Sequence, residues 1–436
     1  MEFVFSRVFK TANTFGIEDP MNKVFAFISV CFFAVLSLAQ QNPCLDIKTI
    51  RTVKVPWDPT KPKSATFDYR FKYELVNPLS PTVVILPGGP GQTSIVPTAQ
   101  WPLGAVPANY NKIYIDPRSQ GCNYAIESSV LAQYLKTEYV VNDIYLALKS
   151  IDLKNYIIYG ASYGTIVATQ LAKKIETEKF ELPMALVLEG AVGKKFDNFD
   201  SYFYFFQYEW DNTFKQLPPR WKTYFQTGKN ESAFSKSQWA SLISSDMIIG
   251  DVPEAPVNGN YLFFHLRLLE LYFAKKITPK EQPYLPVLFS KLKDTQFPNL
   301  FFRMIGCGEI WGDWYYGRSL ENGRIVRTGK NVCEGIEYTN PYDAAKFQVS
   351  KNIPIYYFQG TNDPATPLNT ALYHFAVQQK TNRQFFTVSN AAHAPLSGSL
   401  RKCADGIWDS IYAQRTLGRE FASCPRQTVI TSKKAN

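Results

Sequence analysis

The chain has 436 residues, of which 45% are hydrophobic, so it can bury a large core. Its 47 lysines and arginines exceed its 37 aspartates and glutamates, which gives a net charge of +10. Because the basic residues are dispersed among acidic ones and form no stripe with interleaved aromatics, the sequence argues against a nucleic-acid partner.

The N-terminal segment has the pattern of a secretory signal. Lys23 precedes an apolar run over 24–38, and the small-residue pattern Ser-Leu-Ala ends at Ala39. We expect residues 1–40 to be removed. The acidic residues before Met21 are unusual for the start of a signal and leave Met21 open as an alternative start. A membrane anchor is the alternative, but the run is short for a span of about 20 residues. We therefore expect an exported protein, periplasmic or extracellular, without a stable membrane anchor.

Removal of this signal leaves six cysteines, and an even number in an exported chain predicts disulfides. The sequence alone does not select a pairing. Pairing between sequence neighbours favours three bridges: Cys307–Cys333, Cys403–Cys424 and Cys44–Cys122. The chain has no CxxC motif and only three histidines, so we expect no metal site and no cofactor.

The first predicted element is a strand over 67–75, where aromatic and charged residues alternate as in a half-buried antiparallel strand. Short continuous apolar runs follow, and each ends near Gly, Pro, Asp or Asn: TVVILPGG, NKIYIDPR, NYIIYGAS, MALVLEGA, IPIYYFQG and FFTVSNAAH. Strands buried on both faces of a parallel sheet have this composition. A helical pattern over 138–149 lies between two of them, so strands and helices alternate and predict an α/β fold.

The alternation stops over 194–346. This region is rich in aromatic residues and mostly helical in pattern, and strand signals resume at Ile353. We therefore expect a mainly helical cap inserted into one α/β core, whose two parts are 41–193 and 347–425. We expect the last residues, 426–436, to form a frayed basic tail.

The sequence GASYG at 160–164 places Ser162 between two glycines where a predicted strand gives way to a predicted helix. This is the pattern of a nucleophile elbow, a tight turn that exposes the serine hydroxyl at the carboxyl edge of the sheet. Five residues alone are weak evidence, but the flanking apolar strand and amphipathic helix are the context that the motif requires. We predict that Ser162 is a nucleophile.

A serine nucleophile needs a general base, and the base needs a carboxylate that fixes its orientation. Asp363 and His393 each follow a predicted strand, in the order Ser, Asp, His that is typical of the α/β-hydrolase fold. Alone, Asp363 could start a turn and His393 could be a structural loop residue. Together they predict a catalytic triad. His265 and His374 lie in apolar helical stretches and are expected to be core or surface residues.

An acyl-transfer site also needs hydrogen-bond donors for the developing oxyanion. The glycine-rich stretch 88–91 follows a predicted strand directly, and residues without side chains let backbone amides approach a substrate. We expect the amides of Gly89 and Tyr163 to form the oxyanion hole. An ordinary Gly/Pro turn is the alternative.

These residues resemble the proline iminopeptidase and tripeptidyl aminopeptidase branch of the serine α/β-hydrolases. The matching pieces span roughly 80–400: PGGPG at 87–91, DPR at 116–118 with Gly121, GASYG at 160–164, MIGCGEIWGDW at 304–314, GTNDPATP at 360–367, and His393. The resemblance implies a mostly parallel sheet flanked by helices, with an inserted helical cap. Ser119 and Gln120 depart from the family's loop pattern, and we expect the Arg118 side chain to hold that loop in place.

The resemblance also implies cleavage of peptides that have a free amino terminus, with carboxylates of the cap binding the ammonium group. A desolvated ammonium needs such a partner. The matching acid is Glu309, for which a surface or helix-capping role is the alternative. Glu189, at the end of a predicted strand on the same sheet edge, is a second candidate with a structural role as its alternative.

Two other functions are compatible with these residues. A carboxylic ester hydrolase uses the same triad, and it would be favoured if Glu309 and Glu189 face away from Ser162. The second function is that of a non-catalytic binding protein on a hydrolase scaffold. The complete triad argues against this function.

Overall fold

The computed structural model describes residues 44, 47–95, 104–124, 129–196, 199–227, 234–249, 261–292, 299–312, 316–337, 340–424 and 430–435. The predicted signal, residues 1–40 with Met21 as an alternative start, lies outside them. The chain divides into two units, Met1–Lys48 and Thr49–Asn436, and all elements below belong to the second. Within the described residues, every helix is too short or too polar to cross a membrane.

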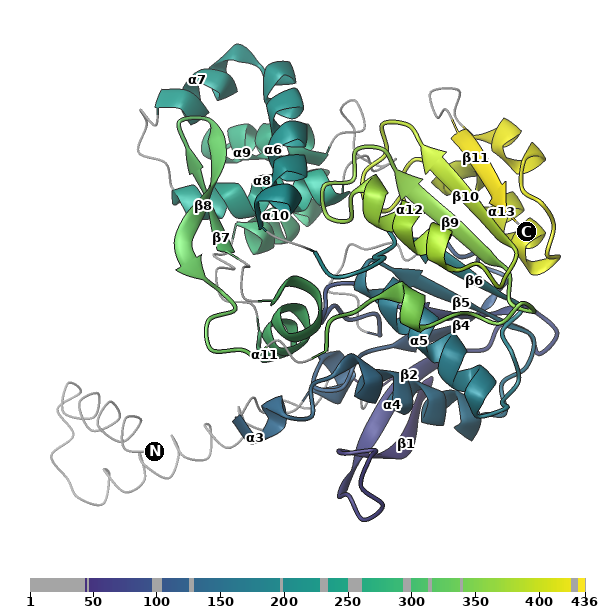
Figure 1. The fold of residues 1–436 in the computed structure, drawn as a ribbon. Coiled ribbons are helices and arrows are strands. Elements are labelled where there is room, and N and C mark those ends of the chain that lie inside the picture. Colours follow the sequence, from purple (N-terminus) through teal and green to yellow (C-terminus); the bar gives the residue numbers. More distant parts are fainter. Residues whose placement is uncertain are drawn as a thin grey trace, which may run out of the picture. The chain divides into compact units, whose positions relative to one another are not determined.

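The second unit is built on a nine-stranded sheet with the order β1-β2-β4-β3-β5-β6-β9-β10-β11 (Figure 1). The strands are β1 (Ile50–Pro56), β2 (Thr66–Glu74), β3 (Thr82–Leu86), β4 (Asn111–Ile115), β5 (Tyr156–Ala161), β6 (Ala185–Glu189), β9 (Ile355–Gly360), β10 (Arg383–Val388) and β11 (Ile430–Ala435). Strands β4, β3, β5, β6, β9 and β10 run parallel, while β1, β2 and β11 are antiparallel to their neighbours. This arrangement is the α/β-hydrolase fold that the sequence predicted.

Helices cover both faces of the sheet, which is why its central strands are apolar throughout. Along β3, Val84 packs in one apolar cluster with α4 (Thr137–Ser150), α5 (Tyr163–Thr177) and α12 (Leu368–Val377). Val83, the preceding residue, packs in a second cluster with α13 (Ala404–Tyr412). Short helical turns complete this core: η1 (Gly121–Asn123), α3 (Ser129–Ala132), η5 (Ala344–Lys346), η6 (Arg401–Cys403) and η7 (Arg419–Ser423).

The region predicted as a cap is mostly helical. Its helices are α6 (Phe199–Gln216), α7 (Pro219–Thr227), α8 (Lys236–Ile249), α9 (Tyr261–Phe273), η2 (Gln282–Tyr284), α10 (Leu285–Lys291), α11 (Leu300–Phe302) and the π-helical segment η3 (Arg303–Trp311). Its two ends meet, because Lys194 pairs with Asp343 and the amide of Ala344 donates to the carbonyl of Gly193 over 2.8 Å. The chain therefore leaves and re-enters the core at one place.

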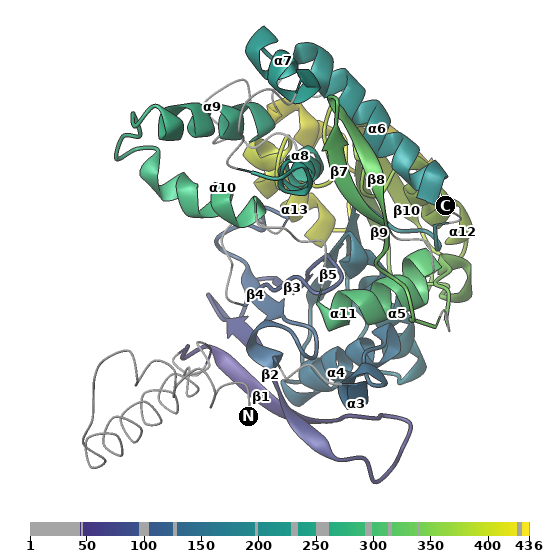
Figure 2. The ribbon, with the colours of Figure 1, turned by 90° about the vertical axis from the view of Figure 1, so that its left-hand side faces the viewer.

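The cap also contains a β-hairpin that the sequence analysis missed. Strands β7 (Tyr316–Glu321) and β8 (Arg324–Asn331) are antiparallel, and Figure 2 shows them next to α6 and α8. The turn residues Asn322 and Gly323 both have positive φ, 50° and 77°. Asn-Gly is a strong signal for such a two-residue turn, so this hairpin could have been predicted.

The prediction of a frayed tail over 426–436 was wrong for residues 430–435. These residues form β11, which pairs along the whole length of β10. Thr431 and Ile430 are β-branched and favour a strand. The lysines that suggested a solvated tail, Lys433 and Lys434, are typical of an edge strand.

The cysteines form disulfides, as predicted. Two pairs match the prediction: Cys307–Cys333 and Cys403–Cys424. Cys44 and Cys122 are also disulfide-bonded. Disulfides persist in oxidising compartments, so this chemistry is compatible with an exported protein.

Replacing Cys307 and Cys333 together by alanine should lower the free energy of unfolding by about 3 kcal/mol, because the bridge closes a loop between residues 26 apart in the unfolded chain. Urea denaturation of the variant and of the wild type measures the difference. Reduced wild-type protein is the control and should lose at least as much stability. An unchanged unfolding midpoint in the variant would contradict this account.

Candidate active site

Ser162 lies on a sharp turn between β5 and α5 and has φ 55° and ψ −123°. Its amide donates to the carbonyl of Glu189 over 2.9 Å, which fixes the turn to the neighbouring strand. Any side chain on Gly160 would collide with the carbonyl of Gly164, and any on Gly164 with the carbonyl of Leu86. The two glycines are therefore needed because backbone segments approach closely at both sides of the serine.

Asp363 follows β9, His393 follows β10, and the two side chains interact. The Nδ1 atom of His393 lies 2.7 Å from Oδ2 of Asp363, and both side chains are buried. Burial opposes the charged form of each group, but the attraction between them outweighs it. The pKa of Asp363 is therefore lowered and the pKa of His393 is raised.

Two residues that the sequence analysis missed hold Asp363 in place. Its Oδ2 accepts hydrogen bonds from the Thr366 hydroxyl over 2.7 Å and from Nε2 of Gln359 over 2.9 Å. Its Oδ1 accepts from the amides of Ala365 and Thr366. The Thr366 hydroxyl is also 3.0 Å from Nδ1 of His393. The carboxylate has little freedom to rotate away from the histidine.

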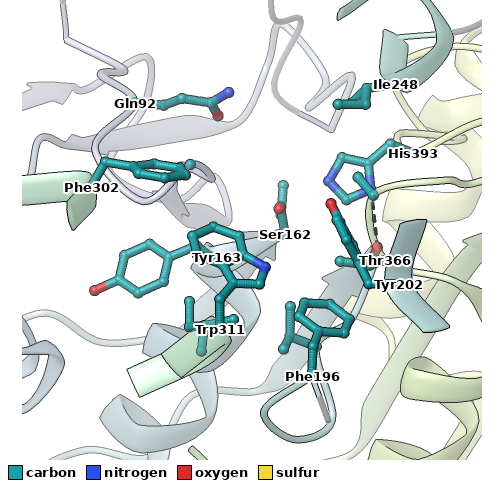
Figure 3. A pocket seen from close by; sticks show the side chains of 15 residues that line it. Gln92, Ser162, Tyr163, Phe196, Tyr202, Ile248, Phe302, Trp311, Thr366 and His393 are labelled. Carbon is teal, nitrogen blue, oxygen red and sulfur yellow. Dashed lines mark hydrogen bonds between the residues drawn. The ribbon is translucent and has the colours of Figure 1, made fainter. Parts of the chain in front are cut away.

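Ser162 and His393 both line a cavity of about 150 Å³ between core and cap segments. Figure 3 shows both side chains facing this space, with Gln92 and Phe302 on the side away from His393. The described lining is mainly apolar: Ala161, Val192, Phe196, Tyr202, Ile248, Phe302, Ile310, Trp311 and Ala365. Among the described residues of this lining there is no aspartate, glutamate, lysine or arginine. The space next to Ser162 suits an uncharged group.

The two predicted oxyanion residues, Gly89 and Tyr163, line the same pocket. Tyr163 is the first residue of α5, so its amide has no intrahelical acceptor and is free to bind a ligand. Gly89 has φ 109°, a conformation that favours glycine. A Cβ on the preceding Gly88 would be 3.0 Å from Cβ of Ser162, so this loop passes close to Ser162.

Arg118 is fully buried and holds its loop in place, as the sequence analysis expected. Its guanidinium makes two hydrogen bonds to Asp143 in α4, of 2.8 and 2.6 Å, and a third to the carbonyl of Trp57 over 2.7 Å. Arg118 is not part of the described pocket lining. It anchors the loop that follows β4.

Glu309 caps the N-terminus of α4, which is the structural role that the sequence analysis gave as the alternative to ammonium binding. Its Oε1 accepts a hydrogen bond from the amide of Thr137 over 2.9 Å. Thr137 is the first residue of α4, where a carboxylate satisfies a free donor and complements the helix dipole. Burial raises the pKa of Glu309 to about 7. Ile310 and Trp311 line the pocket, whereas Glu309 does not.

Glu189 is fully buried at the end of β6 and also does not line the pocket. Its side chain accepts hydrogen bonds from the Tyr159 hydroxyl and from the amide of Leu396. Burial raises the pKa of Glu189 to about 7. Neither predicted ammonium-binding carboxylate therefore faces the space beside Ser162.

The cap contacts the candidate triad at one described point and acts on it electrostatically at another. The amide of His393 donates to the carbonyl of Ile248, near the end of α8, over 3.1 Å. Glu209 in α6 is half-buried, and burial together with repulsion from Asp363 raises its pKa. Glu209 was not predicted, because nothing in the sequence distinguishes it from the other charged residues of α6.

The other two histidines are core residues, within the alternatives that the sequence left open. His374 is buried between the hydroxyls of Tyr357 and Thr169, and burial lowers its pKa to about 3. His265 is buried beside Asp246, with 2.8 Å between its Nδ1 and Oδ2 of Asp246. Lys291 donates to the other oxygen of Asp246, so this cluster connects α8, α9 and α10.

No family model matches the sequence, and no curated protein matches it. Solved structures with a similar arrangement include Rv0554 from Mycobacterium tuberculosis, at 15% identity and a TM-score of 0.44, covering 84% of this chain and 100% of that chain. The esterase RhEst1 from Rhodococcus sp. ECU1013 is 14% identical with a TM-score of 0.42, covering 83% and 98%. A proline iminopeptidase from Mycobacterium smegmatis is 12% identical with a TM-score of 0.43, also covering 83% and 98%. At these identities and TM-scores, the neighbours do not decide what this chain acts on.

Proposed function

We propose that this protein is a serine hydrolase that forms an acyl-enzyme on Ser162. The observation that carries the proposal is one pocket lined by Ser162, by His393 with its bond to Asp363, and by Gly89 and Tyr163. Nucleophile, base, orienting acid and oxyanion donors are the parts that acyl transfer requires.

In this mechanism the Ser162 hydroxyl attacks a substrate carbonyl while Nε2 of His393 takes its proton. The amides of Gly89 and Tyr163 stabilise the oxyanion of the tetrahedral intermediate. The protonated His393 gives its proton to the leaving group, and Asp363 keeps the imidazole oriented throughout. A water molecule, deprotonated by His393, then releases the acyl group and regenerates Ser162.

The narrower proposal is that the substrate is a peptide with a free amino terminus. It is supported by the resemblance of the motifs around Ser162, Asp363 and Gly89 to those of the proline iminopeptidase and tripeptidyl aminopeptidase branch. With Glu309 and Glu189 engaged by backbone amides, Glu209 is the described cap carboxylate that interacts electrostatically with Asp363, and like those two glutamates it lies outside the described pocket lining. We propose Glu209 as the group that holds the substrate ammonium.

The second candidate is a carboxylic ester hydrolase. It is favoured by the apolar lining next to Ser162 and by the direction of Glu309 and Glu189, which face away from the pocket. An uncharged acyl group fits such a lining without leaving a buried charge unpaired.

One substrate series separates the two candidates. A tripeptide p-nitroanilide with a free amino terminus is compared with its acetylated form and with a short p-nitrophenyl ester, using Ser162→Ala as the blank. An aminopeptidase cleaves the p-nitroanilide that has a free amino terminus and leaves the acetylated p-nitroanilide intact. In that case Glu209→Gln should raise KM for the free p-nitroanilide more than Glu309→Gln does. Cleavage of the ester without either amide contradicts the peptidase proposal. Absence of fluorophosphonate labelling at Ser162 contradicts both.

We further propose that the protein is exported after cleavage of residues 1–40. The support is the set of disulfide-bonded cysteines and the signal-like N-terminal sequence. N-terminal sequencing of the mature protein tests the proposal. A mature chain that begins near residue 40 is expected, and one that retains Met21 contradicts it.

A further inference from the structure

Glu189 touches the segments that carry both the nucleophile and the base. Its carbonyl accepts the amide of Ser162 over 2.9 Å. Its side chain accepts the amide of Leu396, three residues after His393. The next residue, Gly190, has φ 60°, and a Cβ there would be 2.6 Å from Cε1 of His393. The end of β6 therefore packs directly against the imidazole.

Burying the carboxylate of Glu189 is costly and raises its pKa to about 7, so Glu189 carries its charge from near-neutral pH upward. Its described hydrogen-bond donors, the Tyr159 hydroxyl and the amides of Leu396 and Ser397, are neutral. Among the described groups, the positive charge that lowers the pKa of Glu189 is that of protonated His393, and this attraction favours the protonated imidazole. A neutral glutamine would fill the same space without supplying that attraction.

Within the described part of the chain, the other titratable groups near this pair are Tyr159, Asp363 and Glu209. Tyr159 is fully buried and its pKa is raised well above the usual value by burial and by Glu189, so it stays neutral. Asp363 occupies the Nδ1 side of His393, and Glu209 acts on Asp363. Among the described residues, His393 therefore interacts with the carboxylates of Asp363 and Glu189, and its described hydrogen bond to a carboxylate is to Asp363.

We propose that Glu189 is a positioning residue for His393: it anchors the loop that carries the imidazole, and its charge stabilises the imidazolium formed when Ser162 loses its proton. The catalytic part of this proposal rests on the proposed function, because it assigns His393 as the general base. The electrostatic part does not, because it concerns the protonation of His393 in the resting protein.

The test is an NMR titration of histidine-labelled protein, in which the chain gives three imidazole signals. In Glu189→Gln the pKa of His393 should fall by about one pH unit, because an opposite charge nearby is removed. The matched control is Glu309→Gln, which neutralises an equally buried glutamate that interacts with Thr137 and should leave the pKa of His393 unchanged. Equal pKa values of His393 in Glu189→Gln and wild type overturn the proposal.

The same variants give a kinetic readout. In Glu189→Gln the acid limb of the kcat/KM profile should move to lower pH by about one unit, and kcat should fall about tenfold. If the acid limb of the kcat/KM profile does not shift in Glu189→Gln, the proposed role of Glu189 in catalysis is overturned. If Glu189→Gln does not fold, the wild-type titration decides: coupling to Glu189 spreads the His393 titration over two steps, and a single step overturns the proposal. The NMR titration gives a result even if no substrate is cleaved. Failure of the Glu189 proposal can therefore be distinguished from failure of the proposed function.

Discussion

Ser162→Ala should lower kcat/KM by about 10⁴-fold or more, whichever carbonyl substrate the protein cleaves. In the proposed mechanism the Ser162 hydroxyl, which lines the pocket, is the nucleophile, and the remaining rate would come from the oxyanion donors and from binding alone. The measurement is steady-state hydrolysis of the best substrate found in the p-nitroanilide and p-nitrophenyl ester series.

This substitution isolates the chemistry because it disturbs little else. Ser162 makes no side-chain capping bond to α5, and alanine meets the same backbone strain at φ 55° as serine does. Ser150→Ala is the control, since Ser150 is at the end of α4 and bonds only to the carbonyl of Ala147. Activity of Ser162→Ala within tenfold of wild type would rule out the acyl-enzyme mechanism.

The parts of the site that sequence predicted are those with strict local requirements. Ser162 needs two close backbone approaches, and only glycine at Gly160 and Gly164 permits them. Asp363 and His393 were recognisable because each directly follows a buried strand of a parallel sheet. Such strands end at one edge, so residues that are far apart in the sequence come together there.

The parts that sequence missed depend on side-chain direction. Gln359 precedes the acid by four residues, and its amide turns back to the Asp363 carboxylate only because of the path of the loop. Glu309 was correctly placed next to pocket residues, but its side chain points to the first turn of α4. Glu189 was correctly placed at the sheet edge, but its carboxylate bonds to Tyr159 and Leu396. Position on an element does not fix these contacts, because a rotamer change redirects the carboxylate.

Asp363→Asn should lower kcat/KM by about 10⁴-fold at neutral pH. Oδ2 of Asp363 accepts hydrogen bonds from the side chains of Thr366 and Gln359 and faces Nδ1 of His393, while Oδ1 accepts two backbone amides. Asparagine has one acceptor oxygen, and the two amides retain it at the Oδ1 position. Its NH2 group then faces His393 and favours the tautomer that carries its proton on Nε2. That tautomer cannot accept the proton of Ser162.

The pH dependence distinguishes this explanation from simple unfolding. Attraction to Asp363 raises the pKa of His393, so its loss should move the acid limb of kcat/KM to lower pH while the maximum falls. Thr366→Val removes one donor to Oδ2 and keeps the charge, so the limb should stay in place. A limb that does not move in Asp363→Asn would contradict the role of Asp363.

Activity that survives in Asp363→Asn would measure how much the carboxylate of Glu189 stabilises the imidazolium of His393. Glu189 still attracts the imidazolium in that variant, because its bonds to Tyr159 and Leu396 do not involve Asp363. The double variant Asp363→Asn with Glu189→Gln should therefore fall below the single variant, toward the level of Ser162→Ala. Equal rates in the single and double variants would contradict a contribution of Glu189 that is independent of Asp363.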